Sequence, residues 1–181
     1  MKIITVSGAH SGIGKTTIAE HILSQLRNWS ALKVTVIKDG PCPRKISCGV
    51  CEQQNAPFSI VSEARIINQK GKDTQRMKSA GAKKVLWLKA KPSGLKQGLR
   101  KALARFNSCE GVVIEGSSVL KYLKPDWGIF ILSRPKTLPF RARMDNGRSS
   151  IPPRGTPDFS PGGSIFIFII LQGRLSLLNT L

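Results

Sequence analysis

The sequence contains no long hydrophobic run. The longest one, Ile165–Leu171, is far shorter than the roughly 18 apolar residues that a membrane-spanning helix requires. The first residues, Met1–Val6, lead into a glycine-rich loop and not into a signal-peptide cleavage site. We therefore expect a cytoplasmic protein with no membrane partner.

Acidic residues are scarce. The 181 residues include 10 Asp and Glu but 29 Lys and Arg, which gives a formal net charge of +19. Such a surplus attracts nucleic acid or anionic membranes and suits a protein that handles phosphorylated ligands, but a lysine-rich solvated surface also explains it. Because no aromatic RNA-binding motif and no helix-turn-helix pattern accompanies the charge, nucleic acid is not the partner we expect.

Cysteine is sparse as well. Four cysteines in a cytosolic chain argue against a disulfide framework. Three of them follow a Cys-x5-Cys-x2-Cys spacing, and its C-x2-C part is typical of a metal knuckle. Zinc with a fourth ligand, an iron–sulfur cluster and unliganded reduced thiols are the alternatives. The candidate ligands are Cys42, Cys48 and Cys51, with Cys109 as a fourth if the fold brings it close.

Strand-like and helix-like segments alternate over residues 1–132. This alternation predicts an α/β fold, with a mostly parallel sheet flanked by helices and the carboxyl ends of the strands along one edge. We expect strands at Lys2–Val6, Lys33–Lys38, Val85–Leu88, Gly111–Glu115 and Trp127–Leu132. We expect helices at Thr16–Arg27, Ser62–Gln69, Asp73–Ala80 and Gly94–Phe106.

The composition changes after Leu132. Residues 133–181 hold 1 Lys and 6 Arg, against 16 Lys and 6 Arg before them, and six of the eleven prolines. This tail is either a disordered basic extension or the product of a shifted reading frame. We divide the chain into a domain at 1–132, with a cysteine-containing insert at 41–61, and an atypical Pro/Arg-rich tail at 133–181.

The segment after the first strand has the spacing of a Walker A phosphate loop, with Ala9 in place of the first glycine. Glycines let successive backbone N–H groups point at the phosphates, the lysine reaches the β- and γ-phosphates, and the threonine hydroxyl binds Mg²⁺. The order of strand, loop and helix is the one that this motif needs. The predicted phosphate-binding residues are Ala9, Ser11, Gly12, Ile13, Gly14, Lys15, Thr16 and Thr17.

Two carboxylates are candidates for the remaining Mg²⁺ ligands or for positioning a water molecule. Glu115 ends an apolar strand, as a Walker B carboxylate does, and Asp39 follows the second strand. The alternative for Glu115 is a solvated glutamate at the end of a strand. With Lys15, the two carboxylates form the predicted catalytic set.

The order of SGIGKTT, VTVIKDG, GKDTQRMKSAGAKKV and VVIEG resembles the MobB family, the GTP-binding accessory proteins of molybdopterin guanine dinucleotide synthesis. The resemblance covers about residues 1–132. It implies a P-loop fold of the dimerising GTPase class, GTP with Mg²⁺, weak GTPase activity, a homodimer and a molybdopterin guanylyltransferase as partner. It also implies that Asp73 and Arg76 lie near the nucleotide or the substrate groove. The alternative for these two is a helix N-cap or first-turn carboxylate and a surface arginine.

No Asn-Lys-x-Asp sequence follows Leu132, so the preference for guanine comes from the resemblance alone. Two other functions remain open from the residues. The chain could be a different P-loop kinase or ligase, or a metal- or redox-responsive module that uses the nucleotide as a switch.

Overall fold

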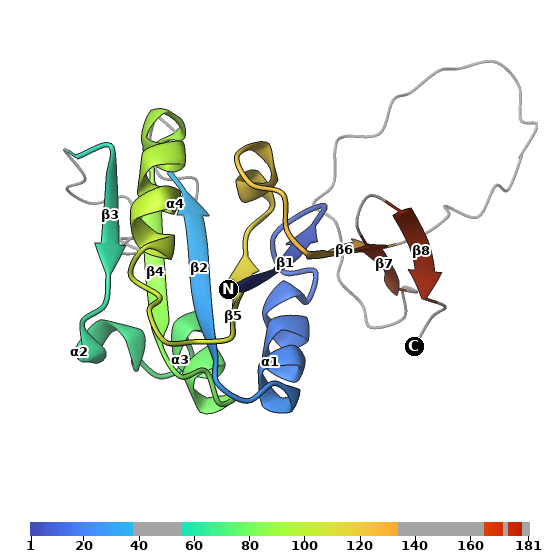
Figure 1. The fold of residues 1–181 in the computed structure, drawn as a ribbon, viewed down its shortest axis with the longest axis horizontal. Coiled ribbons are helices and arrows are strands. Elements are labelled where there is room, and N and C mark those ends of the chain that lie inside the picture. The colour runs from blue at the N-terminus through green and yellow to red at the C-terminus, as the bar shows by residue number, and fades with distance from the viewer. Residues whose placement is uncertain (38–55, 134–164, 172–173, 179–181) are drawn as a thin grey trace, which may run out of the picture.

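The computed structural model describes residues 1–37, 56–133, 165–171 and 174–178. Within these residues the strands form one sheet in the order β3-β4-β2-β5-β1-β6-β7-β8 (Figure 1). The five strands β4, β2, β5, β1 and β6 run parallel, while β3, β7 and β8 are antiparallel to their neighbours. The predicted α/β class with a mostly parallel sheet is therefore confirmed.

The parallel strands are those that the apolar runs predict, and their bounds differ by a few residues. They are β1 (Lys2–Gly8), β2 (Trp29–Val36), β4 (Val85–Ala90), β5 (Gly111–Glu115) and β6 (Trp127–Ser133). All five residues of β5 are buried, as expected for a parallel strand that is covered on both faces.

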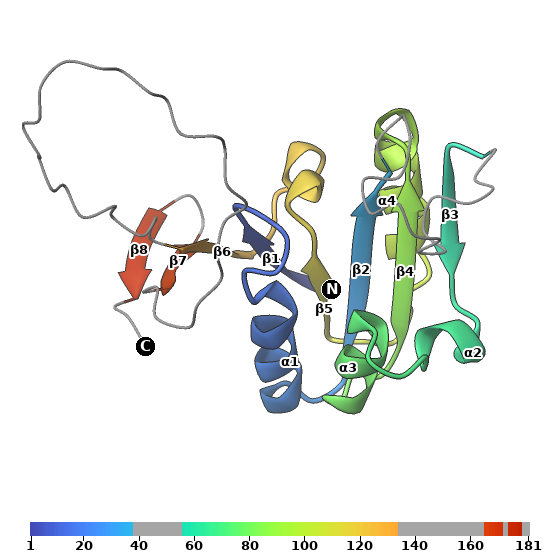
Figure 2. The same ribbon diagram turned by 180° about the vertical axis from the view of Figure 1, so that it is seen from behind.

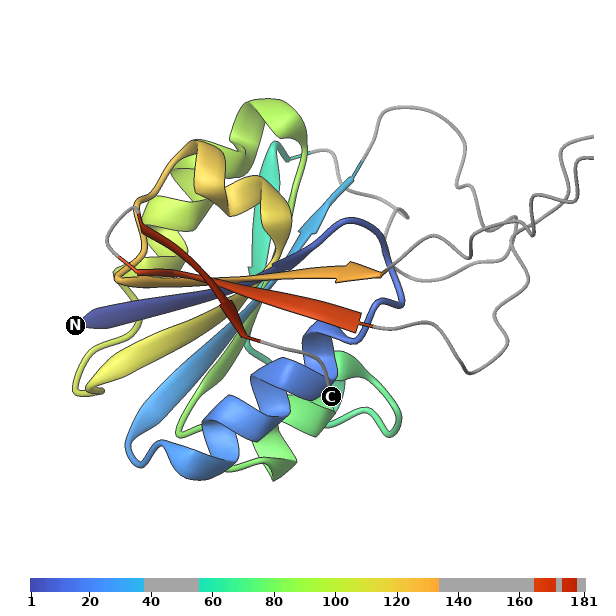
Figure 3. The same cartoon turned by 90° about the vertical axis from the view of Figure 1, so that its right-hand side faces the viewer.

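Helices cover both faces of the sheet, as Figure 3 shows in a view along it. One face carries α1 (Lys15–Gln25) and α3 (Asp73–Ser79), which lie in front in Figure 2, with the single turn α2 (Ala64–Ile67) beside them. The other face carries α4 (Leu95–Leu103) and two short 3₁₀ segments, η1 (Pro92–Gly94) and η2 (Ser117–Lys121).

Each face has its own apolar cluster. Ala31 of β2 and Val113 of β5 are fully buried in the cluster under α1 and α3. The next residues, Leu32 and Ile114, belong to the cluster under α4 and η2. Because side chains alternate along a strand, Lys33 and Glu115 project toward the same face as Ala31 and Val113.

Three strands were not predicted. Phe58–Val61, which the sequence analysis places in the insert, forms the edge strand β3. Beyond Ser133, β7 (Ile165–Leu171) pairs with β6 and β8 (Arg174–Leu178) pairs with β7. The predicted helix at Ser62–Gln69 is reduced to the turn α2. No helix among the described residues has the length and the apolar character needed to cross a membrane.

Candidate functional site

The loop between β1 and α1 depends on two glycines. Gly12 has a φ of 79° and Gly14 a φ of 96°, in the left-handed region that glycine enters without strain. Gly14 is the N-cap of α1, and its carbonyl accepts a hydrogen bond from Ile18 N–H at 3.1 Å. The first-turn N–H groups of a helix lack helical partners, so the start of α1 is suited to an anion.

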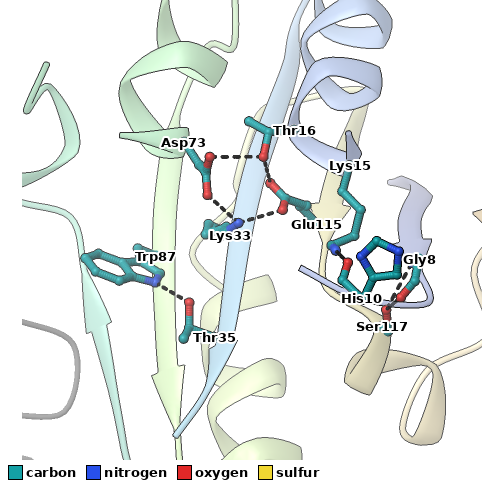
Figure 4. A network of polar contacts seen from close by, with 10 residues as sticks. All are labelled: Gly8, His10, Lys15, Thr16, Lys33, Thr35, Asp73, Trp87, Glu115 and Ser117. Carbon is teal, nitrogen blue, oxygen red and sulfur yellow. Dashed lines mark hydrogen bonds and ion pairs between the residues drawn. The ribbon is translucent and has the colours of Figure 1, made fainter. Parts of the chain in front are cut away.

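Lys15 bends back over this loop. Its Nζ donates a hydrogen bond to the His10 carbonyl at 2.6 Å (Figure 4). Burial lowers the pKa of Lys15 below its ordinary value; the charge of Lys33 acts in the same direction, and the carboxylates of Glu115 and Asp73 oppose it. An ammonium group beside the start of a helix can neutralise a bound anion.

A hydroxyl from the first turn of α1 meets two carboxylates. Thr16 Oγ1 lies 3.0 Å from Asp73 Oδ1 and 3.0 Å from Glu115 Oε2. Thr16 and Glu115 are buried, whereas the Asp73 side chain is 41% exposed. The three residues come from α1, β5 and the start of α3, so the fold brings together groups that lie far apart in the sequence.

Lys33, which was not among the predicted site residues, completes this cluster. Its Nζ lies 2.6 Å from Asp73 Oδ2 and 2.6 Å from Glu115 Oε1 (Figure 4). Lys33 is directly opposite Glu115 in the parallel register of β2 and β5. A lysine inside a buried parallel strand is unusual, and this was the one signal in the sequence that could have pointed to it.

The neighbouring groups determine the protonation state of the Asp73 carboxyl. Burial raises the pKa of its carboxyl, but the hydrogen bond and charge of Lys33, the Thr16 hydroxyl and the charge of Arg76 more than offset it. The pKa of Asp73 therefore lies below its ordinary value, and the carboxylate is ionised at neutral pH.

Ser117 fixes the end of β1. Its hydroxyl accepts a hydrogen bond from Gly8 N–H and donates one to the Gly8 carbonyl, both at 3.1 Å. Gly8 has no room for a side chain, because a Cβ there would lie 2.7 Å from Cγ2 of Ile13. The start of the loop is thus held from η2, two residues after Glu115.

Arg76 contacts α1 and not the cluster. Its Nε donates to Glu20 Oε1 at 2.8 Å, and its Nη2 donates to Glu20 Oε2 and to Thr17 Oγ1. Asp73 thus joins Thr16, whereas Arg76 ties α3 to α1 and reaches Thr17, one of the predicted phosphate-binding residues.

The remaining candidates fall into two groups. Asp39, Cys42, Cys48 and Cys51 lie outside the described residues. Cys109 is described: its thiol is 3.9 Å from the Phe106 carbonyl and packs against the apolar cluster under α4. It precedes the first residue of β5, at the opposite end of that strand from Glu115. Within the described residues, no group of three or more His, Cys, Asp or Glu side chains is placed to bind a metal ion.

The fold and the cluster define an α/β protein with a mostly parallel sheet. Where β1 and β5 end, a glycine loop with Lys15 lies next to a threonine that contacts two carboxylates. Comparisons of the chain with protein-family models, with curated proteins and with solved structures found no match.

Proposed function

We propose that this chain is a P-loop protein of the dimerising GTPase class that binds GTP with Mg²⁺ and hydrolyses it slowly. The observation that carries the proposal is the meeting of Thr16 with Glu115 and Asp73, one residue after Lys15 at the start of α1. A match to the Walker A motif requires only the right residues at the right spacing in the sequence. The contact with the carboxylate of β5 is an independent feature that a Mg²⁺–triphosphate site needs.

The donor set fits Mg²⁺. Three oxygen atoms, from Thr16, Asp73 and Glu115, converge, but the hydroxyl has a single hydrogen to share between two carboxylates. The cluster therefore has a surplus of acceptor oxygens. Hard divalent cations prefer such oxygens, and Mg²⁺ commonly takes one or two protein ligands together with phosphates and waters.

Each residue has a role in this proposal. The first-turn N–H groups of α1 and the ammonium group of Lys15 bind the phosphates. Thr16, Glu115 and Asp73 would hold the metal ion. When bound, the metal neutralises charge on the phosphate oxygens and so favours transfer of the terminal phosphoryl group.

The biological role that we propose is that of an accessory protein in molybdopterin guanine dinucleotide synthesis. The support for it is the resemblance to the MobB family, which the order of the loop, the KDT segment and VVIEG along the chain carries. On the same basis we propose a homodimer and a guanylyltransferase as partner.

Titration with fluorescent GTP and ATP analogues in the presence of Mg²⁺ tests the nucleotide site. We expect GTP to bind more tightly than ATP. We expect Lys15→Ala to weaken binding at least about tenfold, because it removes a charge-assisted contact to the phosphates. Lys96→Ala, an exposed lysine on α4, is the matched control. Tighter binding of ATP would refute the GTP assignment, and unchanged binding by the Lys15 variant would refute the site.

A further inference from the structure

Lys33 is a cation built into the cluster that we assign to Mg²⁺. Its side chain, 18% exposed, reaches the α1 face of the sheet, where it contacts both carboxylates at 2.6 Å. Each carboxylate uses one oxygen for Lys33 and the other for Thr16, so the four groups form a closed ring (Figure 4).

The ring sets the charge of the metal site. Asp73 and Glu115 alone would place two negative charges beside Thr16, one of them on a side chain that is only 3% exposed. A pair of close carboxylates with no cation is strongly unfavourable in such surroundings. With Lys33 between them, the net charge of the group falls from −2 to −1, and one oxygen of each carboxylate is already used.

We propose that Lys33 makes metal binding dependent on the nucleotide. By neutralising part of the carboxylate pair, it keeps a divalent cation out of the site until a triphosphate brings further oxygen ligands and negative charge. The inference rests on the proposed function and extends it: the metal enters with the nucleotide and not before it. Lys33 is a positioning and selectivity residue, since it acts on the carboxylates and touches no phosphate in this scheme.

The test measures metal binding in the absence of nucleotide, with Mn²⁺ as the probe and electron paramagnetic resonance of free Mn²⁺ as the readout. The full chain is used. We expect Lys33→Met to bind Mn²⁺ at least about tenfold more tightly than the wild type, because the substitution frees two carboxylates. Lys33→Arg, which keeps the charge, and Lys96→Met, on the far face of the sheet, should behave as the wild type does.

The second variant locates the site. Asp73→Asn in the Lys33→Met background should abolish the gained Mn²⁺ binding. Equal Mn²⁺ affinity in wild type and Lys33→Met would overturn the proposal, and so would a gain that survives the Asp73 substitution.

Loss of Lys33 also leaves a buried carboxylate without its counter-ion, so Lys33→Met could fail to fold in the absence of metal. Circular dichroism with and without Mn²⁺ covers that outcome. Folding that returns with Mn²⁺ supports the proposal, whereas a chain that stays unfolded, and does so in Lys33→Gln as well, contradicts it.

The readout separates this inference from the nucleotide site. If the wild type fails to bind GTP but Lys33→Met gains Mn²⁺, the proposed function fails while the carboxylate site stands. If GTP binds as expected and Lys33→Met gains nothing, only the inference fails.

Discussion

The Thr16 side chain contacts both carboxylates of the candidate site. Its methyl and hydroxyl lie in the first turn of α1, and one hydrogen serves two carboxylate oxygens at 3.0 Å. Lys33 lies on the other side of both carboxylates, and its positive charge helps to stabilise this arrangement. The protonation state of Asp73 therefore depends on its neighbours. Because that state affects the stability of the fold, it can be followed through the pH dependence of stability.

Asp73→Asn tests this link through the pH dependence of stability. Although partial burial raises the pKa of Asp73, the hydrogen bond and charge of Lys33, with the Thr16 hydroxyl and the charge of Arg76, hold this pKa below its ordinary value in the folded protein. A carboxyl with a lowered folded pKa stabilises the fold at pH values above its unfolded pKa, and this stabilisation is lost as the pH falls through the folded pKa. We expect the wild type to exceed the variant in melting temperature near neutral pH and the gap to narrow below about pH 4. Thermal melts across that range measure it, and a gap independent of pH would contradict the assignment.

At the scale of elements, the connection between η2 and β1 links the two halves of the site. Glu115 ends β5, and two residues later Ser117 binds both backbone groups of Gly8, where the loop begins. A displacement of β5 would therefore move the carboxylate and the loop together. The register supports this, since Val6 lies opposite Glu115.

Removal of the Ser117 hydroxyl should loosen that connection. Ser117→Ala leaves the Gly8 N–H and carbonyl without their partner, and we expect a loss of about 0.5–1.5 kcal/mol in the free energy of unfolding. We also expect nucleotide affinity to fall several-fold, because the loop begins at Gly8. Chemical denaturation and nucleotide titration measure the two effects. Ser118→Ala, one residue further along η2, is the matched control, and equal behaviour of the two variants would argue against the role of Ser117.

The elements also show which parts of the fold the sequence could predict. Short runs of β-branched residues such as Val112, Val113 and Ile114, which follow a glycine, favour buried parallel strands. The strand at Phe58–Val61 has only four partly buried residues, and its pairing with β4 is a tertiary interaction that leaves little local signal. The local sequence was also insufficient for the helix predicted at Ser62–Gln69, which forms only a single turn.

At the scale of the whole molecule, some residues of the site could be predicted from the sequence and others could not. Spacing predicts Lys15 and Thr16, and the end of an apolar strand predicts Glu115, because these signals are local. A lysine in a buried strand is a signal for Lys33, but its contacts with Asp73 and Glu115 could not be predicted, since they depend on the register of β2 against β5 and on where α3 begins. Asp73 was placed near the nucleotide by resemblance; its contact with Thr16 requires the packing of α3 beside α1.

The pairing of the strands in the sheet predicts the effect of removing the strands beyond Ser133. In the described sheet β7 pairs with β6 and β8, and the candidate site draws on β1, β2, β5, α1 and α3. We therefore expect a chain that ends after Ser133 to keep the parallel sheet and to bind GTP within about twofold of the full chain, a change smaller than the loss of one hydrogen bond.

That shortened chain leaves β6 as an edge strand. Unpaired backbone groups at a sheet edge favour association with another chain, so its average mass should rise with concentration more steeply than that of the full chain. Light scattering with size-exclusion chromatography measures this. A chain that ends after Leu171, in which β7 still covers β6, should bind GTP equally and associate less than the one that ends after Ser133. Unfolding of the shorter chain would instead show that the parallel sheet depends on its antiparallel edge.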